Sequence, residues 1–513
     1  MVRLSHGGVL TLEEFHDARD AVAELGTRSP LAFAVTAQAV DTQDFGFLLP
    51  GLQDDPDNLL PEGRRTRDAL VDLGRAMRAG GGGDSPIPAA YTYFGQFVDH
   101  DITLELESAA LPDLVDPDLT PLGRAEIRER IRNARTATLE LDSVYGGPAP
   151  RDGDKMSIGR VTQSGPRPPG KDDRNDLPRR GRSDDPKLDR EAKIGDPRND
   201  ENLVVAQMHV AFLRAHNRLV NRGEDFRGAR RILRQHYQHV VLHDFLKRIA
   251  DPQVVNETIA QNRVYRPGED RPFMPLEFSV AAYRLGHSMV RAQYDFNVNF
   301  LPAALGQLFT FTALSGQLGD FDTLPQLWII EWEHFVDAGA PFNKARSIDT
   351  KVVEPLFELP DLQGRPLQGD RARLAVRNLL RGYLLRLPTG QAVARELKQR
   401  LQGVRDVPVL SAQQIREAAA SDDQVRVLSD AEFLQRRTPL WYYVLAEAAS
   451  LGGGERLGPV GSTIVAEVLV GLVRRSENSI LRAGDWQPTL PSAQAGEFTL
   501  ADLLRFAGVL GQP

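Results

Sequence analysis

The 513-residue sequence predicts a mainly α-helical fold. Several long stretches have apolar residues at three- and four-residue spacing, which is the period of an amphipathic helix. Stretches that alternate apolar and polar residues are scarce, so few strands are expected, and no internal repeat is evident. The length allows two or three domains or one large helical domain, and a composition of 41% hydrophobic and 26% charged residues is typical of soluble globular proteins.

The chain begins with an expected irregular arm, residues 1–86, which mixes a short helical pattern with Pro- and Gly-rich sequence. The arm ends in the flexible joint "AGGGGDSPIPAA". From Tyr91 onward the pattern is mostly helical. Helices are expected over 91–105, 121–135, 201–223, 229–250, 274–291, 325–337, 371–387, 391–402, 411–419, 429–450 and 461–475.

A long polar run, residues 148–197, interrupts this helical pattern. Its proline, glycine and charge content cannot bury enough apolar surface to pack by itself. We therefore expect a surface loop whose mixed charges form a solvated face.

Charge and cysteine content exclude several classes of function. A formal net charge of −8 and a pI of about 5.8 give no electrostatic case for nucleic acid binding. The chain has no cysteine, which excludes disulfides, thiolate metal sites and cysteine nucleophiles. The N-terminus lacks the apolar core of a secretory signal, and "GSTIVAEVLVGLV" is too short to span a bilayer. We expect a soluble protein, cytoplasmic or exported without a cleaved signal peptide, with no membrane insertion.

The stretch "YTYFGQFVDHDITLE" concentrates polar residues in an otherwise apolar helix. Gln96, Asp99 and His100 share one helical face, whereas Asp101 points about 100° away from His100. Buried polar groups need partners or a chemical role. A hydrogen-bonded core histidine would explain His100 without any function, so the segment alone leaves both interpretations open.

Two further segments carry candidate groups. In "GDPRNDEN", Arg198 and Glu201 lie at the start of a helix, where capping explains the acids but not an inward-pointing arginine. In "YRLGHSMV", His287 follows a glycine that leaves room for something flat and bulky. Structural roles are the better interpretation for the remaining helical histidines: His209, His216, His236, His239 and His243.

Taken together and in this order, "FGQFVDHD", "GDPRNDEN…LRAHNRL", "YRLGHSMV" and "RNLLRG" resemble the animal-type haem peroxidases of the peroxidase–cyclooxygenase superfamily. "HYQHVVLHDFL" and "TPLWYYVLAEAASLGGGERLGPVGSTIVAEVL" add to the resemblance, and the latter resembles the tail of bacterial single-domain members. The resemblance implies one large helical haem-peroxidase domain over residues 87–513, with the haem b held between helices.

The resemblance also implies a role for each matching position. His100 would be the distal histidine, Gln96 its neighbour over the haem and Arg198 the distal arginine. His287 would ligate the haem iron, with Asn378 as its hydrogen-bond partner and Arg284 as a further haem-binding residue. Asp99 and Glu201 match acids that form ester bonds to the haem, in whole or in part. The implied calcium ligands are Asp101, Thr136, Thr138, Glu140 and Asp142.

The chemistry of peroxide cleavage suits these groups. A histidine that titrates near neutrality can take a proton from one peroxide oxygen and return it to the other, while an arginine stabilises the leaving oxygen. The implied function is therefore reduction of hydrogen peroxide with oxidation of small organic donors or (pseudo)halides, in a response to oxidative stress.

Departures from the family pattern bear on the alternatives. Asn202 stands where chloride-oxidising mammalian members have a methionine, so a sulfonium link to the haem is impossible. Fatty-acid dioxygenases of the superfamily need a tyrosine two residues before a tryptophan, and Ile330 precedes Trp332 here. A fatty-acid dioxygenase and a haem-free adhesion or assembly protein remain the alternatives, and the sequence does not define the oligomeric state.

Overall fold

The computed structural model describes residues 2–3, 43–79, 83–107, 111–147, 149–186, 188–267, 272–359 and 366–511. Residues 4–42 of the expected N-terminal arm and residues 80–82 of its joint lie outside the described residues.

Helices dominate the described residues, which confirms the predicted fold class. Short 3-10 and π-helical turns connect many of the α-helices. The α-helices that build the body of the molecule are α3 (Arg64–Ala76), α4 (Ala90–Ile102), α7 (Leu203–Asn221), α8 (Phe226–His239), α10 (Pro252–Ala260), α12 (Leu374–Leu384), α13 (Gly390–Arg400), α15 (Asp422–Asp430), α17 (Leu440–Leu451), α18 (Pro459–Arg475) and α19 (Leu500–Ala507). Shorter ones are α5 (Arg124–Arg130), α6 (Asp142–Tyr145), α9 (Leu246–Ile249), α11 (Gly286–Met289), α14 (Ala412–Glu417) and α16 (Phe433–Arg436).

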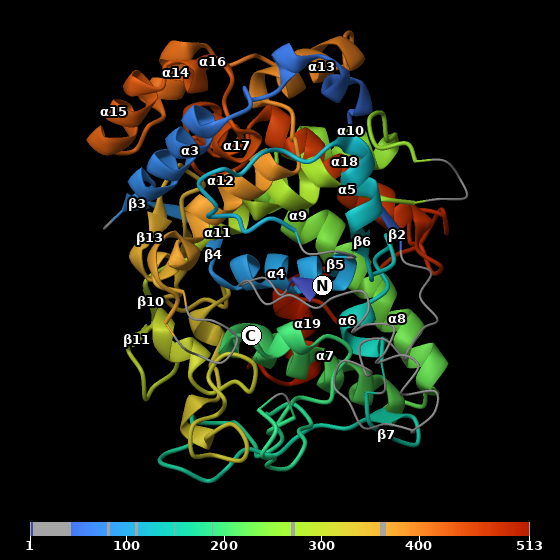
Figure 1. The fold of residues 1–513 in the computed structure, drawn as a ribbon. Coiled ribbons are helices and arrows are strands. Elements are labelled where there is room, and N and C mark those ends of the chain that lie inside the picture. The colour runs from blue at the N-terminus through green and yellow to red at the C-terminus, as the bar shows by residue number, and fades with distance from the viewer. Residues whose placement is uncertain are drawn as a thin grey trace.

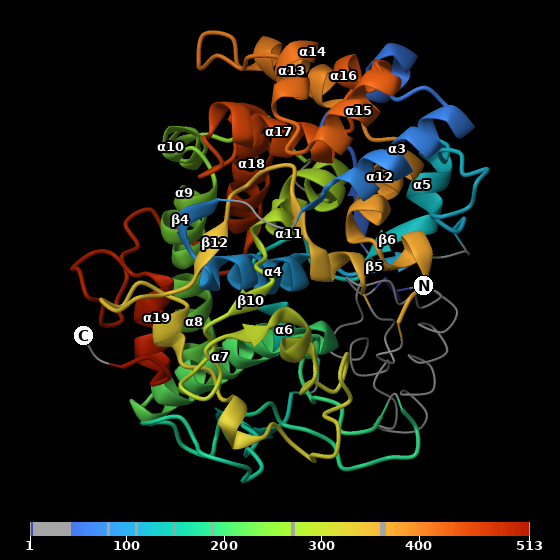
Figure 2. The same ribbon diagram turned by 90° about the vertical axis from the view of Figure 1, so that its left-hand side faces the viewer.

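Helix α4 runs through the middle of the molecule between two groups of helices (Figures 1 and 2). On one side it packs against α7, which in turn packs against α8 and α19. On the other side lie α11, α12, α17 and α18, and α3 covers α12. Many of the buried residues of α4 are apolar, among them Phe94, Phe97 and Val98, which are fully buried. The helix that carries the "FGQFVDHD" motif is therefore held inside the core.

Side-chain caps explain where several helices begin. The Asn202 side chain accepts a hydrogen bond from the Val205 amide at the start of α7, and Asp225 does the same for Gly228 in α8. Such caps satisfy backbone N–H groups that have no partner within the helix.

Strands are short and peripheral. The largest sheet has the order β1-β5-β6-β2-β9 and is mainly antiparallel, with a parallel β2–β9 pair. Its strands are β1 (Val2–Arg3), β2 (Gln43–Gly46), β5 (Glu105–Glu107), β6 (Ile131–Asn133) and β9 (Met274–Pro275). Two-stranded pairs join β4 (Asp84–Pro88) to β12 (Lys344–Arg346), β3 (Arg78–Ala79) to β13 (Val352–Val353), β10 (Gln293–Tyr294) to β11 (Ala303–Ala304), and β7 (Arg151–Asp152) to β8 (Lys155–Met156).

Four helix predictions were wrong in detail. The helix expected over 121–135 ends at Arg130, because Ile131–Asn133 form strand β6. Residues 325–337 form only the 3-10 turns Gln326–Trp328 and Trp332–His334. The carbonyls of Leu327 and Ile329, which an α-helix would pair within itself, instead accept hydrogen bonds from Nδ2 of Asn297. The apolar spacing of this segment reflects a buried loop. The expected helix over 429–450 is broken before Leu440, where Pro439 cannot continue a helical hydrogen-bond ladder.

The expected helix over 274–291 changes its hydrogen-bonding pattern twice. It consists of a π-helical turn, Glu277–Ala281 (η5), a 3-10 turn, Ala282–Leu285 (η6), and the short helix α11. Such irregular turns within helices are frequent at functional sites, and this one carries His287.

The polar segment 148–197 loops along one end of the molecule, below α7 in Figure 1. It is not wholly solvated, because the Arg179 side chain is 2% exposed and pairs with Asp176 and Asp200. None of the helices in the described part of the chain has the length and hydrophobicity needed to cross a membrane.

Candidate active site

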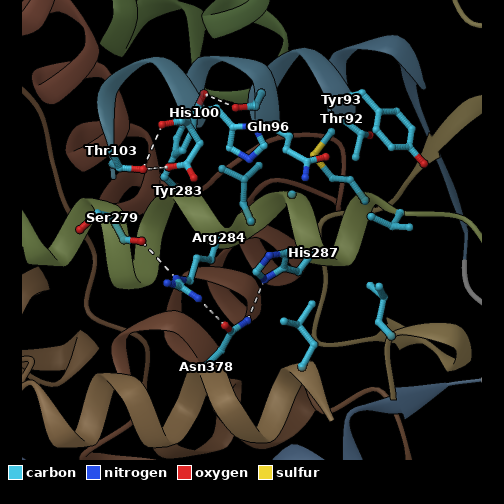
Figure 3. A pocket seen from close by; sticks show the side chains of 18 of the residues that line it. Thr92, Tyr93, Gln96, His100, Thr103, Ser279, Tyr283, Arg284, His287 and Asn378 are labelled. Carbon is cyan, nitrogen blue, oxygen red and sulfur yellow. Dashed lines mark hydrogen bonds between the residues drawn. The ribbon is translucent and has the colours of Figure 1, made fainter. Parts of the chain in front are cut away.

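One cavity lies between α4 and the segment that carries His287, and it encloses about 1580 Å³ of empty space including its open mouth. Figure 3 shows Gln96 and His100 on the α4 side and His287 with Asn378 on the opposite side. The cavity is lined by seven residues that the sequence singled out: Gln96, Asp99, His100, Arg198, Arg284, His287 and Asn378. We call the α4 side the distal wall and the His287 side the proximal wall.

On the distal wall, His100 is fully buried and held through one ring nitrogen. Its Nδ1 lies 2.8 Å from Oδ1 of Asn199. Its Nε2 is buried and has no hydrogen-bond partner among the described residues, and the nearest carboxylate oxygen is Oε1 of Glu201 at 3.6 Å. Burial and then the charge of Arg198 lower the pKa of His100. The structure thus presents a neutral imidazole with one nitrogen at the cavity.

Arg198 is buried and fixed beside His100. Its Nε and Nη2 donate to the Asp196 carboxylate, and Nη2 also donates to the carbonyls of His100 and Thr103. Burial alone would raise the pKa of Asp196, but Arg198 and Arg135 hold it far below its usual range. The guanidinium is consequently immobilised next to the cavity before any ligand arrives.

The other acids of the distal wall form a small network. Gln96 donates through Nε2 to Glu201 and accepts at Oε1 from Asn202 Nδ2 at 3.1 Å. Asp99 lines the cavity and accepts a hydrogen bond from the Thr103 hydroxyl at 3.0 Å. Glu201 is not among the lining residues, although it contacts both Gln96 and His100.

On the proximal wall, His287 is also held at Nδ1 by an asparagine. Nδ2 of Asn378 lies 2.7 Å from His287 Nδ1, and Oδ1 of Asn378 accepts from Nη1 of Arg284 at 2.7 Å (Figure 3). A guanidinium has donors only, so the carbonyl end of this amide must face Arg284. The NH₂ end therefore faces the imidazole.

Space and charge around His287 suit a flat anionic ligand. A Cβ added to Gly286 would meet nothing within 4 Å, and this glycine lines the cavity. Besides Arg198, three arginines line the same cavity: Arg284 on η6, and Arg377 and Arg381 one turn apart on α12. Arg381 is buried and pairs with Glu105, which also lines the cavity. Most other lining residues are apolar. A porphyrin with its carboxylates near the arginines is compatible with this lining.

The comparisons with known proteins agree with this geometry. Residues 120–304 match the family model described as animal haem peroxidase. A peroxidase-like protein of Margaritifera margaritifera is 35% identical over 120 residues, and thyroid peroxidase of Canis lupus familiaris is 29% identical over 106 residues. Residues 120–304 of this chain therefore correspond to an animal haem peroxidase domain.

The aligned stretches are short compared with either partner. They cover 20% of this chain and 15% of the Margaritifera protein, and 19% of this chain and 11% of the canine enzyme. Solved structures extend the likeness of this haem peroxidase homologue to its whole fold. Peroxidase A from Dictyostelium discoideum gives a TM-score of 0.55 at 16% identity and covers 86% of this chain and 90% of that chain. A fatty acid α-dioxygenase from Arabidopsis thaliana gives 0.54 at 13% identity, with 88% and 74% covered. At such identities the likeness concerns the fold alone.

The calcium ligands expected in this haem peroxidase homologue are only partly brought together. Asp101 is buried, and the charge of Asp142 adds to that burial in raising the pKa of Asp101 to about 7. The Thr136 hydroxyl donates to Asp142 at 2.6 Å. Glu140 instead pairs with Arg234 at 3.1 Å. No cluster of three acidic or histidine side chains suited to a metal occurs in the described ranges.

Sequence reasoning missed two parts of the site. The sequence patterns single out neither Asn199 nor Arg381 as a site residue. The i, i+3 spacing of Asn378 and Arg381 on α12 puts both near the proximal wall, so this arginine could have been found. Asn199 and His209 could not, because the contact with His100 bridges 99 positions of sequence.

Proposed function

We propose that this protein is a haem peroxidase that reduces hydrogen peroxide and oxidises small organic donors or (pseudo)halides. The observation that carries the proposal is the facing pair of histidines across one cavity. Beside His100, whose Nε2 has no hydrogen-bond partner in the described part of the chain, lies an immobilised guanidinium, and His287 stands opposite with a hydrogen-bond partner of its own.

The residues present fit a haem. His287 would ligate the iron through Nε2, and Arg284 and Arg381 would bind the haem carboxylates. Asp99 and Glu201 are the candidates for ester links, while Asn202 here caps α7 and holds Gln96. When bound, the haem would supply the iron at which the peroxide bond is cleaved.

The chain's own groups would handle the protons and charge. His100 Nε2 would accept a proton from the peroxide oxygen next to the metal and deliver it to the departing oxygen. Arg198 would stabilise the negative charge on that departing oxygen, and its bonds to Asp196 and two carbonyls hold it in place at no further cost in reorganisation.

Calcium belongs to the same proposal. Asp101 directly follows His100, and a cation between Asp101 and Asp142 would neutralise two buried carboxylates that repel each other. It would anchor the helix that carries the distal base. Thr136 would contribute its hydroxyl oxygen, and Glu140 would have to leave Arg234 to take part.

A fatty-acid dioxygenase is the second candidate, favoured by the similarity in fold to fatty acid α-dioxygenases. Against it, the position two residues before Trp332 is Ile330, which cannot form a tyrosyl radical and does not line the cavity. Oxygen uptake with linoleate, compared with peroxide-dependent dye oxidation, separates the two activities. A haem-free adhesion or assembly protein, the third alternative, would show no haem absorbance after purification with haem b.

The decisive experiment is stopped-flow mixing of the haem-loaded chain with peroxide. His100→Ala is expected to slow the reaction by roughly 10²–10⁴-fold while the haem stays bound, since a positioned base contributes about that much. His216→Ala, which removes a buried histidine of α7 bound to Tyr145 and Asp154, is the matched control and should react like the parent. An unchanged rate in His100→Ala would refute the assignment.

A further inference from the structure

The distal imidazole is part of a chain of three buried side chains. Asn199 Oδ1 lies 2.8 Å from His100 Nδ1, and Asn199 Nδ2 lies 2.9 Å from His209 Nδ1. All three residues are 0% exposed. We propose that Asn199 and His209 are positioning residues that fix the tautomer of His100, with its proton on Nδ1 and the lone pair of Nε2 directed at the cavity.

The proton positions follow along the chain. The Asn199 NH₂ group can only donate, so Nδ1 of His209 must be an unprotonated acceptor. A cationic His209 would put two donors face to face, and burial lowers the pKa of His209 to about 3, so the ring is neutral. The carbonyl end of the amide then faces His100 and accepts its Nδ1–H. A neutral imidazole has one proton, and Nε2 is left as the acceptor.

The amide is held by what surrounds it. Asn199 lies in the 3-10 turn Pro197–Asp200, and both of its neighbours are locked in buried ion pairs. Arg198 is paired with Asp196 at 2.7 Å, and Asp200 is paired with Arg179 at 2.6 Å. Asp200 also accepts from the amide of Ala313 at 3.0 Å. The backbone on each side is thereby prevented from turning the asparagine away.

His209 has the matching support. It lies on α7, whose surrounding side chains are buried, and its ring meets Phe97 of α4 edge-on with 6.3 Å between centroids. Its Nε2 is buried and has no hydrogen-bond partner among the residues that the structure describes. Burying an unpaired nitrogen costs free energy, and a leucine of similar size would fill the same space without that cost. A purely structural role therefore does not explain a histidine at this position.

The inference rests on the proposed function, because only a base that accepts a proton from peroxide needs a lone pair on Nε2. The tautomer itself can be measured independently of peroxidase activity. The full-length, haem-loaded protein in its diamagnetic ferrous carbonyl form, with ¹⁵N-labelled histidine, reports the protonated nitrogen of each imidazole in long-range ¹H–¹⁵N spectra, and His100→Ala assigns the resonance.

Four variants are compared with the parent protein. The parent should show His100 protonated at Nδ1. Asn199→Leu removes the acceptor and should move part or all of the His100 proton to Nε2. The reaction with peroxide should then slow about tenfold or more, which is part of the roughly 10²–10⁴-fold acceleration that a general base supplies. Asn199→Asp keeps the acceptor and should keep the tautomer. His209→Leu frees the amide to turn and should give a mixture, whereas His216→Leu should change nothing.

The outcomes separate the two hypotheses. A parent protein with the His100 proton on Nε2, or an Asn199→Leu variant with the parent's tautomer, overturns the inference whatever the activity. If Asn199→Leu does not fold, the parent spectrum and His209→Leu still decide. If the tautomers shift as expected while the parent fails to react with peroxide, the positioning chain stands and the proposed peroxidase function falls.

Discussion

Each wall of the cavity holds its histidine through an asparagine amide, but the amide oxygen faces the imidazole on the distal wall and the amide NH₂ group faces it on the proximal wall. On each wall an asparagine amide lies against the imidazole Nδ1, at 2.8 Å for His100 and 2.7 Å for His287. Behind the distal amide stands a neutral histidine, which can accept. Behind the proximal amide stands Arg284, which can only donate. Arg284 therefore forces the NH₂ end of the proximal amide toward His287, whereas His209 accepts from the distal amide in the orientation that turns the amide oxygen toward His100.

This difference has a consequence for metal binding. An imidazole that ligates iron through Nε2 carries its proton on Nδ1 and needs an acceptor there. The proximal amide offers its NH₂ end, so haem binding requires it to turn by 180° and Arg284 to find another acceptor. The haem carboxylates are such acceptors. We infer that the distal wall is organised in advance, whereas the proximal wall is completed by the haem.

Removing the proximal imidazole should have the largest effect. His287→Ala is expected to abolish the haem absorbance band, because no other histidine of the described residues lines that wall of the cavity. Titration of the purified protein with haem b measures this. His216→Ala should bind haem like the parent, and an unaltered band in His287→Ala would mean that another residue holds the iron.

Replacing the proximal amide should have the next largest effect. Asn378→Leu removes the acceptor for the His287 Nδ1–H and should weaken haem binding by about 10–100-fold, the usual cost of losing such a partner. Asn378→Asp keeps an acceptor and should bind haem at least as tightly, with a lower reduction potential. Equal affinity in both variants would contradict a hydrogen bond from His287 to this residue in the haem-bound protein.

The distal wall should respond to calcium removal. A chelator at neutral pH is expected to lower the thermal unfolding midpoint by a few degrees, because Asp101 and Asp142 then repel each other in a buried site. Asp101→Asn, which removes one charge with little change in shape, should be insensitive to the chelator. A parent protein that unfolds at the same temperature with and without chelator would show that no calcium is held there.

Exchanging the group behind the proximal amide tests the comparison itself. In the haem-free full chain, His287 should carry its proton on Nε2, since its Nδ1 faces the Asn378 NH₂ group. Arg284→Met removes the donor that fixes this orientation and should give a mixture of tautomers, measured by histidine ¹⁵N spectra. The His100 signal serves as the internal control and should not move.

The smallest effect concerns buried acids. Asp196 on the distal side is paired with two arginines, whereas the hydrogen bonds that Glu447 of α17 accepts from the described residues come from the amides of Val460 and Gly461. Burial raises the pKa of Glu447 from 4.5 to about 8. The unfolded chain ionises first, so the free energy of unfolding should fall as pH rises from about 4.5 to about 8. Denaturant titrations of Glu447→Gln should show a weaker decline over this window.

Much of the site follows from local spacing. One turn of helix puts Gln96, Asp99 and His100 on one face, and all three line the cavity. The loop over 325–337 was mistaken for a helix because burial in an irregular segment can imitate helical spacing. The orientation of the two amides could not be foreseen at all, since it depends on partners, His209 and Arg284, that only the folded chain brings behind them.

The polar segment 148–197 supports the distal side of the cavity, which its composition does not indicate. Arg179 reaches from it to Asp200, the neighbour of Asn199, and is almost wholly shielded from solvent. A proteolytic nick or an engineered shortening of this excursion would leave the histidines and the arginine of the cavity untouched. It would nevertheless remove the ion pair between Arg179 and Asp200 that stabilises the turn next to His100. The position of the distal base therefore depends on a surface segment that does not reach the cavity.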